Sequence, residues 1–130
     1  MQLLPDQMWT ANPKIIYVFR QPKDVVVSNF HQYHALENYQ GGIKEVVDCF
    51  VKDLITWSPF HGHISNFLEL SEIQKNIHLI RYEDLKKDLK HEILRMAEFL
   101  ETPISDEDVL KLIDHLNIKN MKSILEENLY

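Results

Sequence analysis

The sequence is poor in cysteine and glycine, and each shortage excludes a class of structure. Cys49 is the only cysteine among the 130 residues, so no internal disulfide can form. This composition suits a reducing compartment, and we expect a cytoplasmic location. The three glycines, Gly41, Gly42 and Gly62, fit neither a Walker-type phosphate loop nor a GxGxxG turn. The chain therefore holds no glycine-rich phosphate loop of its own.

Long apolar runs and an excess of positive charge are also absent. The longest unbroken apolar run is Ile15–Phe19, far short of a membrane span, and the N-terminal MQLLPDQMW does not resemble a signal peptide. Fourteen Lys and Arg stand against twenty Asp and Glu, a net charge of −6. This balance argues against nucleic-acid binding, but it does not exclude a pocket for one small anion. We predict no membrane and no nucleic-acid partner.

The residues that are present predict one helix-rich α/β domain over residues 1–130. Two apolar runs, 14–20 and 76–82, predict strands, and the first lacks alternation, as in a parallel-sheet strand buried on both faces. Periodicity and cap signals predict helices over residues 22–36, 43–55, 61–70, 84–100, 106–116 and 118–125. Two strands alone make no stable open parallel sheet. We therefore favour part of a larger fold over a marginal independent unit.

The end of the first predicted strand is one candidate anion site. Arg20 ends that strand and Pro22 opens the following helix. In open α/β sheets ligands bind at the carboxyl ends of strands, where helix N-termini attract phosphate. Arg20 could hold an anion bidentately there, and Ser28, two helical turns onward, could add a hydroxyl donor. The alternative is that Arg20 pairs with a carboxylate and Ser28 packs against the sheet.

The end of the second predicted strand is another candidate. Tyr82 could stack on a base, and Glu83 and Asp84 could form a catalytic carboxylate pair. The structural alternative, which we favour, is that Tyr82 is a core residue and that the acids stabilise a helix start.

Metal and triad chemistry have weaker support. The histidines include two close pairs, His31 with His34 and His61 with His63, but neither HxxH nor HxH is specific for a metal. No GxSxG nucleophile elbow occurs. We predict no metal site and no serine triad.

Two segments together resemble the cytosolic sulfotransferase family. Residues 13–28 (PKIIYVFRQPKDVVVS) are similar to its pattern of a hydrophobic strand, Arg, one variable residue, Pro-Lys-Asp, and Ser eight positions after the Arg. Residues 80–88 (IRYEDLKKD) resemble its Tyr-Glu-Asp-Met/Leu-Lys segment, and the helix after it is also similar. Order and spacing match across nearly the whole chain. The resemblance implies a sulfotransferase fold, which is P-loop-like and nucleotide-binding.

The family's donor is 3′-phosphoadenosine 5′-phosphosulfate, and the resemblance assigns contacts to it. Arg20 and Ser28 match residues that hold its 3′-phosphate, and Tyr82 matches a tyrosine near the adenine. Asn117 and Met121 fall in a segment that usually reads His-Thr-Ser-Phe-x-x-Met, in which Leu116, Asn117 and Ile118 replace Thr, Ser and Phe. The acceptor-lining positions implied by the resemblance are Gln32, Leu36 and Tyr39.

The resemblance places the family's catalytic residues outside this chain. Its phosphate-loop lysine and catalytic histidine would precede residue 1, and its Arg-Lys-Gly loop would follow Tyr130. We therefore expect an incomplete sulfotransferase domain with no catalytic residue of its own. In the complete enzyme, a sulfuryl group passes from the donor to a hydroxyl or amine of a small molecule, and the full-length protein could form a homodimer. The alternative is a non-catalytic nucleotide-binding or interaction module.

Overall fold

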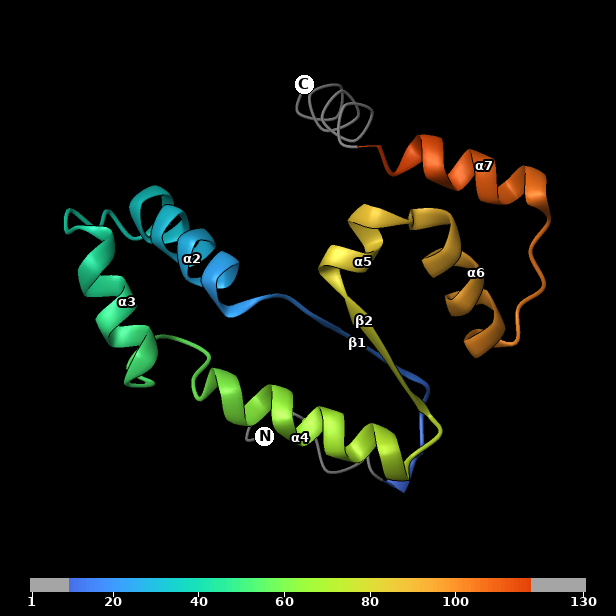
Figure 1. The fold of residues 1–130 in the computed structure, drawn as a ribbon, viewed down its shortest axis with the longest axis horizontal. Helices are drawn as coiled ribbons and strands as arrows, with labels where there is room; N and C mark the ends of the chain where they lie inside the picture. Colours follow the sequence, from blue (N-terminus) through green and yellow to red (C-terminus); the bar gives the residue numbers. More distant parts are fainter. Residues whose placement is uncertain (1–9, 118–130) are drawn as a thin grey trace. The chain divides into compact units, whose positions relative to one another are not determined.

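The computed structural model describes residues 10–117, which divide into two compact units between Glu83 and Asp84. Within the described residues, the first unit contains the sheet and the helices between its two strands, and the second contains most of the first helix after β2 and the helices beyond it (Figure 1). Within residues 10–117, no helix is both long and apolar enough to cross a membrane.

The sheet consists of two parallel strands that lie side by side (Figure 1). Strand β1 spans Ile15–Phe19 and strand β2 spans Ile77–Arg81. The register pairs Ile15 with Ile77 and Phe19 with Arg81. This confirms both predicted strands, each one residue shorter at either end, and the predicted parallel sheet. The pairing brings the carboxyl ends of the two strands to the same edge.

The prediction that β1 is buried on both faces is wrong for the described residues. Its residues alternate between half-buried and exposed, and Ile16 and Val18 are 39% and 51% exposed. On the inner face Tyr17 stacks on Phe67 of α4 (Phe60–Ile73), with ring centroids 4.1 Å apart. Within the first unit α4 covers this one face, so the continuous apolar run of β1 exceeds what that unit buries.

Helix α2 (Pro22–Leu36) has the bounds that the sequence predicts, with Pro22 in its first turn. It packs on α3 (Ile43–Val51) through a core of Val26, Val46 and Phe50. The sequence extends α3 to Ile55, which is wrong by one turn. Asp53 takes a left-handed φ of 56° and breaks the helical path, and Leu54 beyond it is 70% exposed.

The helix predicted over residues 61–70 is α4. It begins one residue earlier than predicted and ends three residues later.

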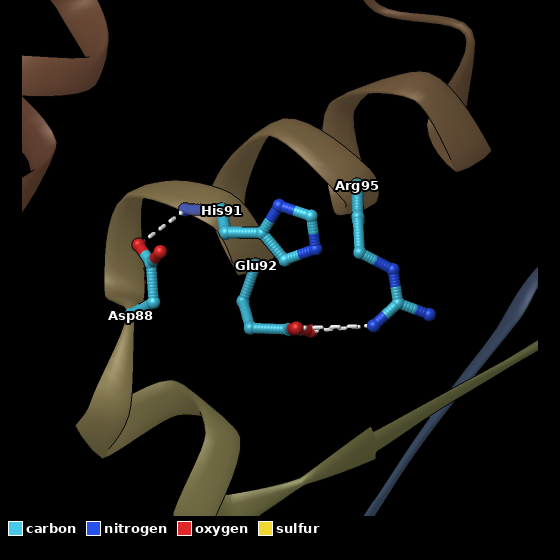
Figure 2. A network of polar contacts seen from close by, with 4 residues as sticks. All are labelled: Asp88, His91, Glu92 and Arg95. Carbon is cyan, nitrogen blue, oxygen red and sulfur yellow. Dashed lines mark hydrogen bonds and ion pairs between the residues drawn. The ribbon is translucent and has the colours of Figure 1, made fainter.

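The predicted single helix over residues 84–100 is two helices. Helix α5 spans Tyr82–Lys87 and helix α6 spans Leu89–Leu100. Asp88 separates them, because its carboxylate accepts the backbone N–H of His91 at 3.0 Å and caps α6 (Figure 2). The apolar stripe continues through this break, so periodicity alone does not reveal it.

Helices α6 and α7 form the core of the second unit. Helix α7 spans Asp106–His115 and is capped by Ser105, as predicted, through the N–H of Asp108 at 3.1 Å. Ile93 and Val109 are buried. Glu92 is buried too, and both its carboxylate oxygens accept from Arg95 Nη1, at 3.0 and 3.1 Å (Figure 2). The helix predicted over residues 118–125 lies outside the described residues.

Candidate functional site

The parallel pairing joins two junctions that the sequence presents as separate candidates. Arg20 follows Phe19, the last residue of β1, and Tyr82 follows Arg81, the last residue of β2. The register pairs Phe19 with Arg81. The guanidinium carbon of Arg20 lies over the Tyr82 ring, 4.7 Å from its centroid. This is a cation–π distance, so the two side chains form one surface at the carboxyl edge of the sheet.

A cleft of about 380 Å³ opens at the same edge. The lining residues come from the end of β1 and its junction with α2, from α4, and from the end of β2 with the start of α5. They are Phe19, Arg20, Gln21, Pro22, His61, Ile64, Ser65, Arg81 and Glu83. The position matches the general rule that ligands of open α/β sheets bind beyond the carboxyl ends of the strands.

The two arginines of the cleft form only weak ion pairs. Arg20 Nε lies 3.7 Å from Asp24 Oδ2, and both side chains are more than a third exposed. Arg81 Nε lies 3.9 Å from Glu83 Oε2. Both distances exceed a hydrogen bond, and exposed pairs of this kind contribute little stability. The alternative that Arg20 pairs with a carboxylate is thus present only as a weak ion pair. Arg20 Nε is buried with no hydrogen-bond partner, so it can still donate to an anion.

Glu83 makes the strongest polar contact of the cleft. Its Oε1 accepts the backbone N–H of Gln21 at 3.0 Å. This bond is the main cause that holds the pKa of Glu83 below its usual value, and the charges of Arg81 and Arg20 lower it further, while burial acts in the opposite direction. The carboxylate therefore stays ionised at neutral pH.

Ser28, Gln32, Leu36 and Tyr39 are not among the residues that line this cleft. Ser28 is exposed on α2, so it does not pack against the sheet. Gln32 and Leu36 are also exposed, and Tyr39 packs on the α2–α3 core and donates its hydroxyl to Gly42 O at 3.2 Å. Asn117 belongs to the second unit, and Met121 is outside the described residues. Roles in nucleotide or acceptor binding stay predictions for all of these residues.

Two cleft residues were not identified as ligand-binding from the sequence. The sequence suggests His61 as a metal ligand or a substitute base, and it gives no role to Ser65. They lie four residues apart on α4, so they share a helix face. Nearby, His63 Nδ1 lies 2.8 Å from the Tyr17 hydroxyl, and burial raises the pKa of that tyrosine. The i, i+4 spacing of His61 and Ser65 in the sequence indicates that they share a helix face. Only the packing of α4 in the structure shows that this face meets the strand ends.

In the described part of the chain, no three His, Cys, Asp or Glu side chains come together as a metal site. His61 is in the cleft and His63 is bonded to Tyr17, so the two do not point to a shared ligand.

Comparison with known proteins gives consistent matches. The model of a family described as "sulfotransferase domain" matches residues 1–129. Luciferin sulfotransferase of Photinus pyralis is 32% identical over 123 residues, covering 93% of this chain and 33% of that protein. Sulfotransferase 1E1 of Rattus norvegicus is 32% identical over 124 residues, covering 94% of this chain and 42% of that protein.

Solved structures agree. Mouse sulfotransferase SULT7A1 complexed with PAP superposes with a TM-score of 0.85 at 28% identity, covering 94% of this chain and 44% of that chain. Retinol dehydratase in complex with androsterone and inactive cofactor PAP gives 0.84 at 33% identity, with 93% and 35% covered. The chain thus spans between a third and just under half of the proteins that it matches.

Proposed function

Because this chain belongs to the sulfotransferase domain family, we propose that it supplies part of the donor site of a sulfotransferase, chiefly the grip on the 3′-phosphate. The donor is 3′-phosphoadenosine 5′-phosphosulfate, which provides the sulfuryl group that such an enzyme transfers. The observation that carries the proposal is the pairing of Arg20 with Tyr82 at the carboxyl edge of the parallel sheet. Two of the structural neighbours are complexes with PAP, the desulfated donor.

The residues present fit a phosphate at this edge. The Nε of Arg20 is a buried donor without a hydrogen-bond partner, which a phosphate oxygen would satisfy. A guanidinium presents two parallel N–H groups to such an anion, and the start of α2 adds the positive end of a fifteen-residue helix. Tyr82 lies against this guanidinium, and its aromatic ring is of the kind on which a base stacks.

The proposal also covers the rest of the reaction at the level of the family. Relatives include a luciferin sulfotransferase and an amine sulfotransferase, which supports a small-molecule hydroxyl or amine as the acceptor. Arg20 and Tyr82 would bind and orient the donor, and orientation of this kind lowers the barrier to an in-line displacement. Assignment of the base and the leaving-group lysine to positions outside residues 1–130 is part of the proposal, as is a cytoplasmic location.

The direct test is calorimetric titration with 3′,5′-adenosine bisphosphate (PAP) of the full-length gene product, by which we mean this chain completed with the flanking segments that the proposal assigns to it. We expect saturable binding at one site per chain. Binding of PAP without sulfuryl transfer to any phenol, alcohol or amine would favour the non-catalytic nucleotide-binding module instead. No binding of PAP would contradict the proposal.

Ser28→Ala is expected to weaken PAP binding modestly in the same protein. Loss of one hydroxyl hydrogen bond costs about 0.5–1.5 kcal/mol, and more when the acceptor is charged. The exposed position of Ser28 leaves its hydroxyl free to turn toward a phosphate. Calorimetry measures the change in dissociation constant. An unchanged affinity would remove Ser28 from the site.

Asp84→Asn is expected to leave turnover nearly intact. Asp84 lies in the first turn of α5, where a carboxylate interacts favourably with the helix dipole. Loss of that charge costs about 0.3–1 kcal/mol of stability. Melting temperature and turnover number are measured together on the full-length gene product. A thousandfold fall in turnover at an unchanged melting temperature would show that Asp84 is catalytic.

A further inference from the structure

The Glu83 carboxylate belongs to one strand–helix junction but is bound to the other. It follows β2, yet its Oε1 accepts the backbone N–H of Gln21, which follows β1 and is 62 residues away in sequence. Gln21 is the N-cap residue of α2, and its own side chain makes no capping hydrogen bond. In a capping box, a glutamate inside the helix binds the N-cap amide. Here a glutamate from the facing junction makes that bond instead.

The amide that Glu83 binds is the peptide group between Arg20 and Gln21. A peptide group is planar and moves as a unit, so a fixed N–H direction also constrains the Cα of Arg20. The guanidinium of Arg20 then rests on Tyr82, the residue directly before Glu83. The main chain and the side chain of Arg20 are therefore both held by consecutive residues of the β2 junction.

The charges around Glu83 make its presence beside an anion site informative. Arg81 and Arg20 are the charged groups that lower its pKa, and the first of these lies 3.9 Å from Oε2. His61 and Ser65 line the same cleft from α4. An ionised carboxylate here repels an incoming anion, so its charge alone would weaken donor binding. Its hydrogen bond to the Arg20–Gln21 peptide would instead favour donor binding.

We propose that Glu83 is a positioning residue, which aims the Arg20 guanidinium at the anion by holding the Arg20–Gln21 peptide. The inference rests on the proposed function, since Arg20 is the group that is positioned. The positioning role predicts that removal of the Glu83 carboxylate weakens anion binding, which is the opposite of what removal of its negative charge alone would do. Removal of a carboxylate beside an anion site should strengthen anion binding if charge were its only influence.

Three variants of the full-length gene product test this role through PAP titration and donor kinetics. Glu83→Ala deletes the acceptor, and Gln21→Pro deletes the donor at a residue whose φ of −57° suits proline. We expect each to raise the dissociation constant of PAP about tenfold, in keeping with loss of a hydrogen bond to a charged group. The donor KM should rise in parallel, with turnover at saturating donor unchanged. Glu83→Gln keeps an acceptor oxygen and should bind PAP at least as tightly as the wild type.

The double variant Glu83→Ala/Gln21→Pro should bind PAP no more weakly than either single variant, since both delete the same bond. Glu72→Gln, an exposed position on α4, is the control and should change nothing. Should Glu83→Ala fail to fold, Gln21→Pro and Glu83→Gln carry the comparison.

Two results would overturn the positioning role. One is a Glu83→Ala protein that binds PAP as tightly as the wild type or tighter. The other is a lowered melting temperature with an unchanged dissociation constant, which a purely structural residue would give. Absence of PAP binding by the wild type would instead overturn the proposed function itself, and the role of Glu83 with it. Wild-type binding with unaffected variants defeats only the positioning role.

Discussion

Arg20→Ala is expected to weaken binding of PAP to the full-length gene product by about 2–5 kcal/mol, taking desolvated interfacial charge pairs as the guide. This corresponds to a rise in dissociation constant of about 30-fold to several thousand-fold. Arg20 is one of the two strand-end arginines of the cleft, and its buried Nε has no hydrogen-bond partner. Its weak pairing with Asp24 offers little that an incoming phosphate would have to displace.

Two further variants give this prediction its controls. Arg20→Lys keeps the charge but loses the planar fork, so it should bind PAP with an affinity between those of the wild type and Arg20→Ala. Lys75→Ala removes the same charge at an exposed position just before β2, at the opposite end of the sheet. It should leave the affinity unchanged. Equal affinities for Arg20→Ala and the wild type by calorimetry would contradict the assignment of Arg20 to the 3′-phosphate.

The sheet and most helices follow from local sequence, because their signals are local. The apolar run of β1 and the proline at the start of α2 need no tertiary information, and both elements lie where the pattern predicts them. The errors arise where a single residue interrupts a continuing apolar stripe. Asp53 ends α3 through its left-handed backbone, and Asp88 starts a new helix through its cap. Periodicity carries no information about either event.

The site was only partly predictable for a related reason. Arg20 and Tyr82 could be identified because each stands at a strand end. Their contact depends on the register of β1 against β2, which pairs residues 62 apart and leaves no local trace. The inclusion of His61 and Ser65 depends on the docking of α4. The bond from Gln21 to Glu83 depends on the same register, so the sequence suggests a catalytic role or a helix start for Glu83 and gives no sign of this contact.

Residues 1–130 expressed by themselves are expected to show no measurable sulfuryl transfer. The chain spans 33–44% of the relatives and solved structures compared above. The proposed function assigns the general base and the phosphate-loop lysine to positions outside residues 1–130. Loss of catalytic groups that act as a unit lowers turnover by several orders of magnitude. His31, His61 and His63 are the candidates for a substitute base, and the Nδ1 of His63 is already engaged by Tyr17.

Residues 1–130 by themselves are also expected to associate in solution, because the sheet in the described residues is small. Within residues 10–117 the sheet has two strands, so each strand presents one unpaired edge. Ile16 and Val18 project from the exposed face of β1. Trp57, after the end of α3, is 75% exposed and extends the apolar surface elsewhere in the unit. Unpaired edges and exposed apolar side chains together favour association between chains.

One experiment tests separately the chemical half of this prediction, which is the lack of sulfuryl transfer, and the physical half, which is association in solution. The 130-residue chain is expressed, its dispersity is measured by light scattering, and it is assayed with labelled donor and a panel of phenols. Full-length sulfotransferase 1E1 of Rattus norvegicus is the positive control. Turnover by a monodisperse monomer would contradict both halves, because it would require a base within these residues and a sheet that needs no further strands. A monodisperse but inactive monomer would contradict only the physical half, since two strands covered by α4 would then suffice for an independent fold.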